Sequence, residues 1–497
     1  MPSSSGSLLL GIDLGSSGVK AILLDPEQGI VASRSYDVTL YSDHPGWSEA
    51  DTEQWWSGVT TLIPLLLRGA KATGADVGAL AVSGMVPAVV LLDGDDRPLR
   101  RAILQNDARA TREIEDIRSA LGGLDLLALT GSVLSQQSVA PTASWLAHYE
   151  PEVWEEVASV RGSYDWLAHA LGARNHVEEN WAIEGGLYDF DRAPIAAVQE
   201  ATNLRWPALL EVCAPSTVVG EVNREAAAAT GLTEGTAIVV GGADHVLSAY
   251  GAGLVREGEC LIKLGGAGDI LAVSDEVLLD QRLYLDRHPV PGKWLPNGCM
   301  ATSGSLLRWE QSIFNDAPLA ELDEAAAHSA PGNLLTLPYF LGEKTPLHDP
   351  DLRGVMVGMN LTTTRGDIHR SFLEAIAYGF RSHVEIFAQD GLALTRTTVT
   401  NGGSKSRLWR EILSDVLNRD LVSITDHPGA AFGAAVIAGI GTGAIEDWSY
   451  VAGALDEGDV IGPDDANVAL YEDRYQEFLR LSDVTTSISH DIARSTS

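Results

Sequence analysis

Two carboxylates that follow apolar strands are the residues of this chain best suited to chemistry. Asp13 ends the apolar stretch LLLGI, and Asp244 follows the stretch AIVVGG and opens a segment with helical character. A carboxylate in such surroundings is costly unless it meets a metal, a hydroxyl or a hydrogen-bond donor. We therefore interpret Asp13 as a candidate Mg²⁺ ligand and Asp244 as a candidate general base that takes the proton of an attacking alcohol.

Each carboxylate also has a purely structural interpretation. Asp13 can accept hydrogen bonds from the amides of the turn that follows it. Asp244 can cap the helix that is expected after it, a role that Asp performs well. The sequence leaves both alternatives open.

Three glycine-rich turns are candidate phosphate or nucleotide contacts. Turns without side chains let backbone N–H groups approach an anion closely. The first turn holds Gly15, Ser16 and Ser17, the second holds Gly265, Gly266 and Ala267, and the third holds Gly402, Gly403 and Ser404 before a helix. None fits the P-loop pattern GxxxxGK[ST] or the GxGxxG dinucleotide fingerprint.

The first two turns indicate an internal repeat. Leu14-Gly15-Ser16-Ser17-Gly18 and Leu264-Gly265-Gly266-Ala267-Gly268 are offset by 250 residues, about half of the chain, and apolar strand residues flank both. The pattern predicts a duplicated fold in which each half begins with a glycine-turn hairpin.

Short apolar strands alternate with longer amphipathic segments along the chain. Strands are expected at 8–13, 19–25, 29–38, 79–85 and 236–240, and helices at 48–70, 108–121, 364–388, 406–418 and 429–441. This alternation predicts an α/β fold with helices on the faces of the sheets.

Composition narrows the function classes. The chain has 497 residues, enough for two domains, and 34 Lys+Arg against 68 Asp+Glu give a net charge of −34. Such a surface repels nucleic acid and anionic membranes, so neither is an expected partner. The three cysteines are far apart in the sequence, and we expect them to be free thiols. We see no leader and no membrane span in the sequence, so we expect a cytoplasmic enzyme.

The motifs, in this order, resemble the FGGY carbohydrate kinases. The resemblance rests on LGIDLGSSGVKAILLD, GWSEADTEQWW, GGADHVLSAYGAG, the segment from GEKTPLHDPDLRG to FLEAIAYGFR, NGGSKSRLWREIL and GAAFGAAVIAGIG, and it covers most of the chain. It implies two ribonuclease H-like domains of the actin and hexokinase type with an interdomain cleft. The domains would span 1–252, which holds the sugar, and 253–485, which holds adenosine, with a flexible tail at 486–497.

The resemblance also assigns the residues. Asp244 takes the place of the catalytic base, and Asp13 that of the Mg²⁺-linked carboxylate. Met85, Asp107, Arg109 and Asp244 are the implied sugar-binding residues, with Trp47 as a further apolar wall. The implied ATP-binding residues are Gly15, Ser16, Ser17, Lys20, Gly265, Gly266, Ala267, Gly402, Gly403 and Ser404.

Three departures from the family pattern bear on ligand recognition. Ala267 removes a hydroxyl that the second phosphate turn usually carries. Val86-Pro87 follows Met85 where xylulokinases carry a His, and Gln105 stands where Trp is common. The expected substrate is an open-chain pentulose such as xylulose; another ketose, a polyol or a sugar acid is the alternative. An ATPase switch of the actin or Hsp70 kind is the rival from another class, and a homodimer is left open.

Overall fold

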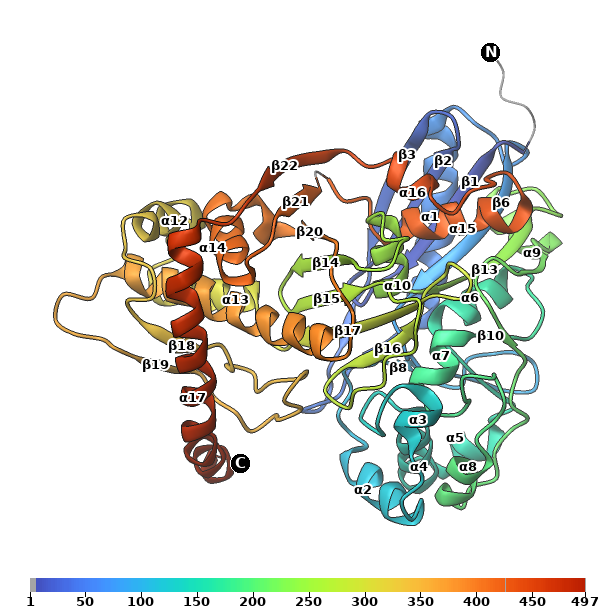
Figure 1. Cartoon of the computed structure of the whole chain (residues 1–497). Coiled ribbons are helices and arrows are strands. Elements are labelled where there is room, and N and C mark those ends of the chain that lie inside the picture. The colour runs from blue at the N-terminus through green and yellow to red at the C-terminus, as the bar shows by residue number, and fades with distance from the viewer. Residues whose placement is uncertain (1–5, 425, 497) are drawn as a thin grey trace. The chain divides into compact units, whose positions relative to one another are not determined.

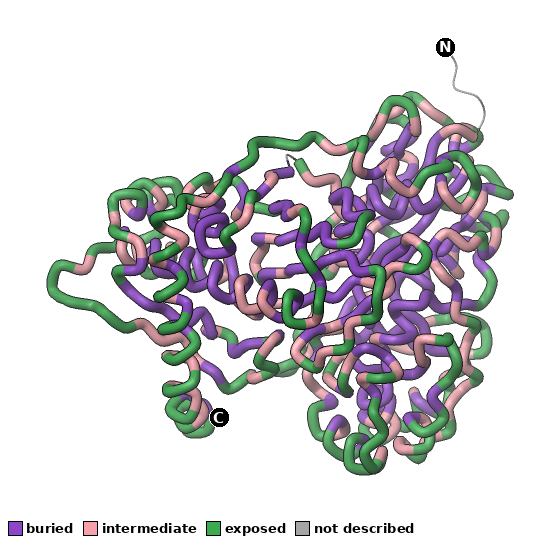
Figure 2. The backbone as a smooth tube through the Cα atoms, viewed as in Figure 1, coloured by how far each residue is buried: buried purple, intermediate pink, exposed green. Residues whose placement is uncertain are grey.

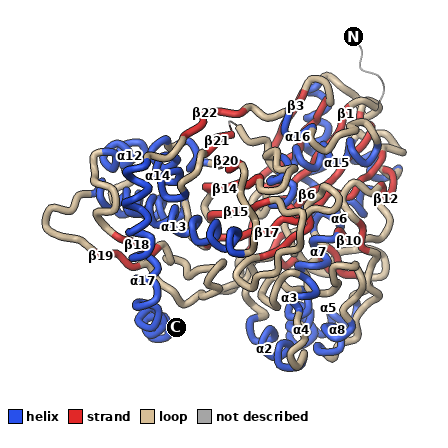
Figure 3. Tube along the Cα trace, viewed as in Figure 1, coloured by secondary structure: helices blue, strands red, loops and turns tan. Residues whose placement is uncertain are grey.

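The computed structural model describes residues 6–424 and 426–496, which form two compact units (Figures 1 and 3). Unit 1 comprises Met1–Val255, Leu285–Lys293 and Pro428–Ala454; unit 2 comprises Arg256–Tyr284, Trp294–His427 and Leu455–Ser497. Each unit has a mixed β-sheet with helices packed on it, as the alternating pattern predicted. The first residues, MPSSSG, are expected from the sequence to be disordered, and residues 1–5 of this stretch lie outside the described residues.

The sheet of unit 1 runs in the order β12-β13-β6-β1-β2-β3. Strands β1, β6 and β13 are parallel, whereas β2, β3 and β12 run antiparallel to their neighbours. The strands of the unit are β1 (Leu8–Leu14), β2 (Gly18–Asp25), β3 (Gly29–Asp37), β4 (Leu40–Tyr41), β5 (Glu49–Ala50), β6 (Val77–Gly84), β7 (Val90–Leu92), β8 (Ala102–Ile103), β9 (Ser159–Arg161), β10 (Val177–Glu178), β11 (Val212–Cys213), β12 (Val218–Glu221) and β13 (Ala237–Ala243).

The helices of unit 1 come from two distant parts of the chain. They are α1 (Thr52–Ala70), α2 (Thr111–Ala120), α3 (Leu126–Thr130), α4 (Val139–Tyr149), α5 (Pro151–Glu156), α6 (Ser163–Leu171), α7 (Glu179–Glu184), α8 (Ala196–Thr202), α9 (Arg224–Thr230), α10 (Asp244–Gly251), α15 (Ala430–Thr442) and α16 (Tyr450–Gly453).

The sheet of unit 2 contains the run β17-β15-β14-β20-β21-β22. Its elements are β14 (Glu259–Leu264), β15 (Gly268–Ala272), β17 (Trp294–Met300), α11 (Gly304–Ile313), α12 (Leu319–Ala327), β18 (Leu335–Leu337), β19 (Val355–Val357), α13 (Arg365–Gln389), β20 (Arg396–Thr400), the 3₁₀ turn η1 (Gly402–Lys405), α14 (Arg407–Leu417), β21 (Leu421–Ile424), β22 (Glu457–Ile461) and α17 (Asp465–Thr496). Strand β16 (Tyr284–Arg287) contains the point where the chain passes from unit 2 to unit 1.

The two sheets repeat one pattern, which confirms the predicted duplication. In unit 2, β14 pairs antiparallel with β15 and parallel with β20, as β1 pairs with β2 and β6 in unit 1. Leu14 ends β1 and Leu264 ends β14, so both glycine turns connect the first two strands of a sheet. The central strands β1, β2, β6 and β13 of unit 1 and β14 and β15 of unit 2 are largely buried, whereas β3 and β22 are mostly exposed (Figure 2).

The boundaries of the units differ from the linear division at residue 252. Helix α15 was expected in the second, adenosine-binding domain, yet it lies in unit 1 and packs in one apolar core with Leu9, Ala81 and Leu247. Helix α17 extends to Thr496 and so includes most of the tail that was expected at 486–497. No helix among the described residues is long and apolar enough to cross a membrane.

The contact between α15 and β1 requires glycine at position 11. A Cβ atom there would lie 1.9 Å from the carbonyl oxygen of Ala431 and 2.7 Å from the amide nitrogen of Ala435. Both are backbone atoms, so the helix itself would have to move. Position 94, in contrast, offers open space to a Cβ atom.

We expect Gly11→Ala to lower the free energy of unfolding by at least about 1–3 kcal/mol, the usual cost of overpacking a core. Gly94→Ala serves as the control and should stay within about 0.5 kcal/mol of the wild type. Denaturant titration followed by circular dichroism measures both. Equal stability of the two variants would contradict the packing described for α15.

Candidate functional site

Three parallel strands of unit 1 end in register and bring candidate residues to one edge. Asp13 on β1 is opposite Ser83 on β6, and Ser83 is opposite Gly242 on β13. Met85 and Asp244 follow directly after β6 and β13. The carboxyl edge of parallel strands is where α/β proteins commonly bind ligands. With β6 between them, β1 and β13 lie about 10 Å apart, two strand spacings.

Asp244 is the first residue of α10 and is held by its own neighbour. The backbone N–H of His245 donates to Asp244 Oδ1 at 2.6 Å. The N-cap position belongs to Ala243, which makes no side-chain cap, so the interpretation of Asp244 as an N-cap is wrong. About 36% of its side chain is exposed, which leaves the carboxylate open to a ligand.

His245 connects Asp244 to a second carboxylate. Its Nε2 lies 2.7 Å from Asp286 Oδ2, and its Nδ1 lies 3.6 Å from Asp244 Oδ1. Burial alone lowers the pKa of His245, but Asp286 and Asp244 outweigh it and raise that pKa well above its usual range. The imidazole therefore carries a positive charge near neutral pH and compensates the charge of Asp244.

Glu184 completes this cluster. Burial and the nearby Asp286 raise the pKa of Glu184 well above its ordinary value, which favours the uncharged carboxyl group. Ligand atoms of Glu184, His245 and Asp286 lie within 4.8 Å of one another, the arrangement of a candidate metal site. The ion pair between His245 and Asp286 accounts for this geometry, and Mg²⁺ prefers oxygen ligands, so we do not place the expected Mg²⁺ here.

Glu178 is a buried acid that the sequence analysis missed. Its Oε2 accepts hydrogen bonds from the hydroxyl of Tyr164 at 2.9 Å and from the backbone N–H groups of Asn180 and Trp181. Burial and the adjacent Glu179 raise its pKa well above the usual value. A Cβ atom at Gly242 would lie 3.6 Å from Glu178 Oε1, so this carboxyl group is close to the end of β13. Two acidic residues in the otherwise apolar segment VEENWAI were the available signal.

Asp107 and Arg109 form a closed network. Asp107 accepts hydrogen bonds from the backbone N–H of Ser48 and from three N–H groups of Arg109. These fill both of its oxygens, so Asp107 is suited to holding Arg109 rather than to binding a sugar hydroxyl directly.

Arg109 retains one group for a ligand. It also donates to Glu49 Oε1 at 2.7 Å, and its guanidinium carbon lies 3.8 Å from the ring centre of Trp47. Its Nη1 is buried and has no hydrogen-bond partner among the described residues. Trp47, expected as an apolar wall, therefore stacks on Arg109. Met85, the other expected wall, is buried, and the hydroxyl of Ser163 donates to its carbonyl oxygen.

The first glycine turn lies beside Asp13. The N–H of Gly15 donates to the carbonyl oxygen of Gly18 at 2.9 Å and closes the turn, while Ser16 and Ser17 are exposed. Lys20 is less open to a phosphate than expected, because its ammonium group donates to the carbonyl oxygen of Pro428 at 2.9 Å.

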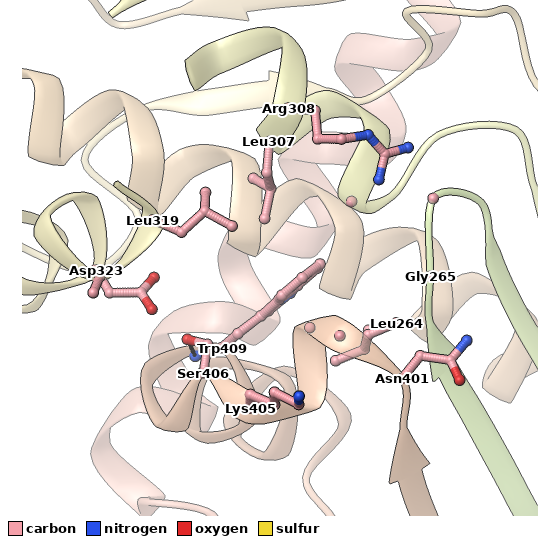
Figure 4. A pocket seen from close by; sticks show the side chains of 15 residues that line it. Leu264, Gly265, Leu307, Arg308, Leu319, Asp323, Asn401, Lys405, Ser406 and Trp409 are labelled. Carbon is pink, nitrogen blue, oxygen red and sulfur yellow. Dashed lines mark hydrogen bonds between the residues drawn. The ribbon is translucent and has the colours of Figure 1, made fainter. Parts of the chain in front are cut away.

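The second and third glycine turns share one pocket of unit 2 with a volume of about 690 Å³ (Figure 4). Gly265, Gly266, Gly402 and Gly403 all line it. Ala267 is exposed and Ser404 faces elsewhere; the Ser404 hydroxyl donates to the carbonyl oxygen of Asn401 at 2.7 Å.

The rest of this pocket was not anticipated. Its apolar wall contains Leu307, Leu319 and Trp409, and its charged groups include Arg308 and Asp323. The carbonyl oxygens of Gly265 and Gly266 accept hydrogen bonds from the N–H groups at 303–305, which begin α11. A sequence signal existed in MATSGSLLRWE, where a strand meets a helix through Thr, Ser and Gly.

A buried histidine supports one side of the pocket. His369 on α13 lies 2.6 Å from Glu310 Oε2 through its Nδ1 and 2.9 Å from Asp323 Oδ1 through its Nε2. Burial lowers the pKa of His369, but the hydrogen bonds to Asp323 and Glu310 outweigh it and raise that pKa to about 9.

Comparisons with known proteins agree with this arrangement. Residues 8–251 match the N-terminal domain of the FGGY family of carbohydrate kinases, and residues 276–442 match its C-terminal domain. A xylulose kinase of Staphylococcus epidermidis (strain ATCC 12228 / FDA PCI 1200) is 29% identical over 499 residues, which cover 98% of both chains. The crystal structure of xylulose kinase from Rhodospirillum rubrum is 38% identical with a TM-score of 0.92, covering 97% of this chain and 100% of that one.

A more distant structure shares the fold. The structure of Plasmodium falciparum glycerol kinase with ADP has a TM-score of 0.86 at 20% identity and covers 96% of this chain and 99% of that one. Such a likeness shows the architecture and no particular ligand.

The pKa of His369 predicts how stability depends on pH. The folded value of about 9 exceeds the ordinary value of 6.5, so the stabilisation is fully present below pH 6.5 and is lost as the pH rises through 9. The difference in unfolding free energy between wild type and His369→Asn should therefore shrink by about 3 kcal/mol between pH 6 and pH 9.5. Urea titrations across this range measure it, with the exposed His328→Asn as control. A difference that does not change with pH would contradict the charge assigned to His369.

Proposed function

The chain belongs to the FGGY family of carbohydrate kinases, and we propose that it transfers the γ-phosphate of ATP to a terminal hydroxyl of an open-chain pentulose of the xylulose type. The observation that carries the proposal is Asp244, a partly exposed carboxylate at the carboxyl edge of three parallel strands. Membership of this family identifies the enzyme as a sugar phosphotransferase. It therefore excludes the alternative interpretation of the chain as an ATPase switch of the actin or Hsp70 kind.

In the proposed reaction Asp244 acts as the general base. The sugar hydroxyl loses its proton to Asp244, a bond forms between its oxygen and the γ-phosphorus, and the bond from that phosphorus to the β-γ bridging oxygen breaks. The products are a sugar phosphate and ADP. In phosphoryl transfer, catalysis rests mainly on positioning and charge stabilisation. The hydrogen bond from the backbone N–H of His245 orients the Asp244 carboxylate. The positive charge of the His245 imidazole lies beside that carboxylate.

The pocket of unit 2 suits the nucleotide. Its volume of about 690 Å³ lies within the range of small-molecule sites, and it combines an apolar wall with Arg308, Lys405 and glycine turns. Asp13 lies near the end of β1, beside the first turn, and its carboxylate oxygens are of the kind that Mg²⁺ prefers as ligands. Mg²⁺ bound there would neutralise phosphate charge.

The sugar would be bound by polar groups of unit 1. Arg109 has its unpartnered Nη1 to offer. The raised pKa of Glu178 favours its protonated form, which can donate a hydrogen bond as well as accept one. Relatives named xylulose kinases support a pentulose. The second candidate, another ketose, a polyol or a sugar acid, is favoured by Val86-Pro87 and Gln105, which depart from the family pattern near these groups.

Asp244→Asn tests the base. The amide cannot accept the proton, so we expect kcat to fall by at least about 10²-fold while the fold and sugar binding persist. Asp125→Asn is the matched control, since Asp125 also stands at the start of a helix of unit 1 but caps α3 away from the strand edge. Release of ADP at saturating substrates is the measurement. Near-normal kcat in Asp244→Asn would remove Asp244 from the chemistry.

A substrate panel tests the acceptor. D-xylulose, other ketoses of four to six carbons, glycerol, erythritol and gluconate are compared by sugar-dependent ADP release. We expect a pentulose to give the highest kcat/KM, at least about 10-fold above glycerol, because a site built to pair several hydroxyls loses those pairings with a shorter ligand. Faster turnover of glycerol or gluconate would favour the second candidate. No turnover above background ATP hydrolysis would overturn the proposed acceptor class.

A further inference from the structure

A carboxylate stands in the wall of the nucleotide pocket without an obvious role in phosphate binding. Asp323 comes from α12, one turn after Leu319, and both residues line the pocket. About 24% of the Asp323 side chain is exposed. Figure 4 shows its carboxylate directed toward the pocket, on the opposite side of the view from Arg308 and Gly265.

The carboxylate is fixed from behind by buried groups. Asp323 Oδ1 accepts from His369 Nε2 at 2.9 Å, and the other ring nitrogen of His369 bonds to Glu310 at 2.6 Å. His369 and Glu310 are both fully buried. They come from α13 and α11, so three helices fix the direction of one carboxylate. Within the described part of the chain the second oxygen of Asp323, Oδ2, makes no hydrogen bond and remains available.

The order of groups along the pocket indicates what would meet Asp323. The Gly265-Gly266 turn and Arg308 suit the phosphates. The side chains of Leu307, Leu319 and Trp409 follow and offer flat apolar contact of the kind that suits a base. Asp323 lies beyond this apolar stretch in the view of Figure 4, where the far edge of a base would lie.

We propose that Asp323 recognises the base of the nucleotide by accepting a hydrogen bond from the exocyclic amino group of adenine. A carboxylate is an acceptor only, so it needs a donor on the base edge. Purine riboside nucleotides lack that amino group and would leave the carboxylate unpaired. This inference rests on the proposed function, which places ATP in this pocket.

Direct binding of nucleoside diphosphates tests the proposal without sugar and without turnover. Titration calorimetry on the full chain compares ADP, purine riboside diphosphate and 2′-deoxy-ADP. The wild type should bind ADP at least about 10-fold more tightly than purine riboside diphosphate, the usual effect of a hydrogen bond to a charged group. In Asp323→Ala the preference should fall to about 2-fold or less, with ADP affinity reduced.

Two further variants separate recognition from structure. Glu324→Ala, an exposed neighbour on α12, should keep the wild-type preference. Asp323→Asn keeps the shape and an acceptor oxygen but no charge, and should retain an intermediate preference. Equal wild-type affinity for ADP and purine riboside diphosphate would overturn the inference alone. The inference would also be overturned if Asp323→Ala lost the preference for ADP over 2′-deoxy-ADP, because the carboxylate would then bind the ribose hydroxyl and not the base. Failure of the wild type to bind ADP at all would instead overturn the nucleotide assignment of the proposed function.

Discussion

The parallel register of β1, β6 and β13 decides which ionisable groups of unit 1 can act together. Asp13, Ser83 and Gly242 are aligned across the three strands, so the residues that follow emerge at one edge. Helix α15 packs closely on this sheet, which glycine at position 11 permits. A side chain at that position would clash with the backbone of the helix that packs on β1, the strand that carries Asp13. The candidate chemistry therefore depends on a contact between segments more than 400 residues apart in the sequence.

The two glycine turns show how a duplicated hairpin can diverge. In unit 1 the turn carries the exposed hydroxyls of Ser16 and Ser17, whereas the turn of unit 2 has only Ala267 at its tip. In unit 2 the segment 303–305 is bonded to the turn through its N–H groups and brings Ser303 and Ser305 beside it. The hydroxyl that Ala267 lacks thus has neighbours that can replace it, which a comparison of the turn alone does not reveal.

Sequence patterns predicted what depends on local order and missed what depends on distant contacts. The strands, the long helices, the hairpin repeat and the position of Asp244 after β13 all follow from periodicity and glycine placement. The hydrogen bond from the Ser48 N–H to Asp107 and the one from Lys20 to the carbonyl oxygen of Pro428 join residues that are far apart in the sequence, so no local pattern indicates them. Asp323 and His369 are likewise 46 residues apart and on different helices. The compact units also differ from a linear division of the chain, because α15 packs with unit 1 although it comes late in the sequence.

Buried acids near Asp244 determine where negative charge resides in unit 1. Burial raises the pKa of Glu178 and of Glu184 well above ordinary values, and it raises that of Asp165 to about 7. These shifts favour the uncharged form of the buried acids. His245, held positive by Asp286, offsets Asp244 itself. The chain carries a net charge of −34, yet the buried acids of unit 1 are shifted toward their uncharged forms and a charged imidazole lies beside Asp244.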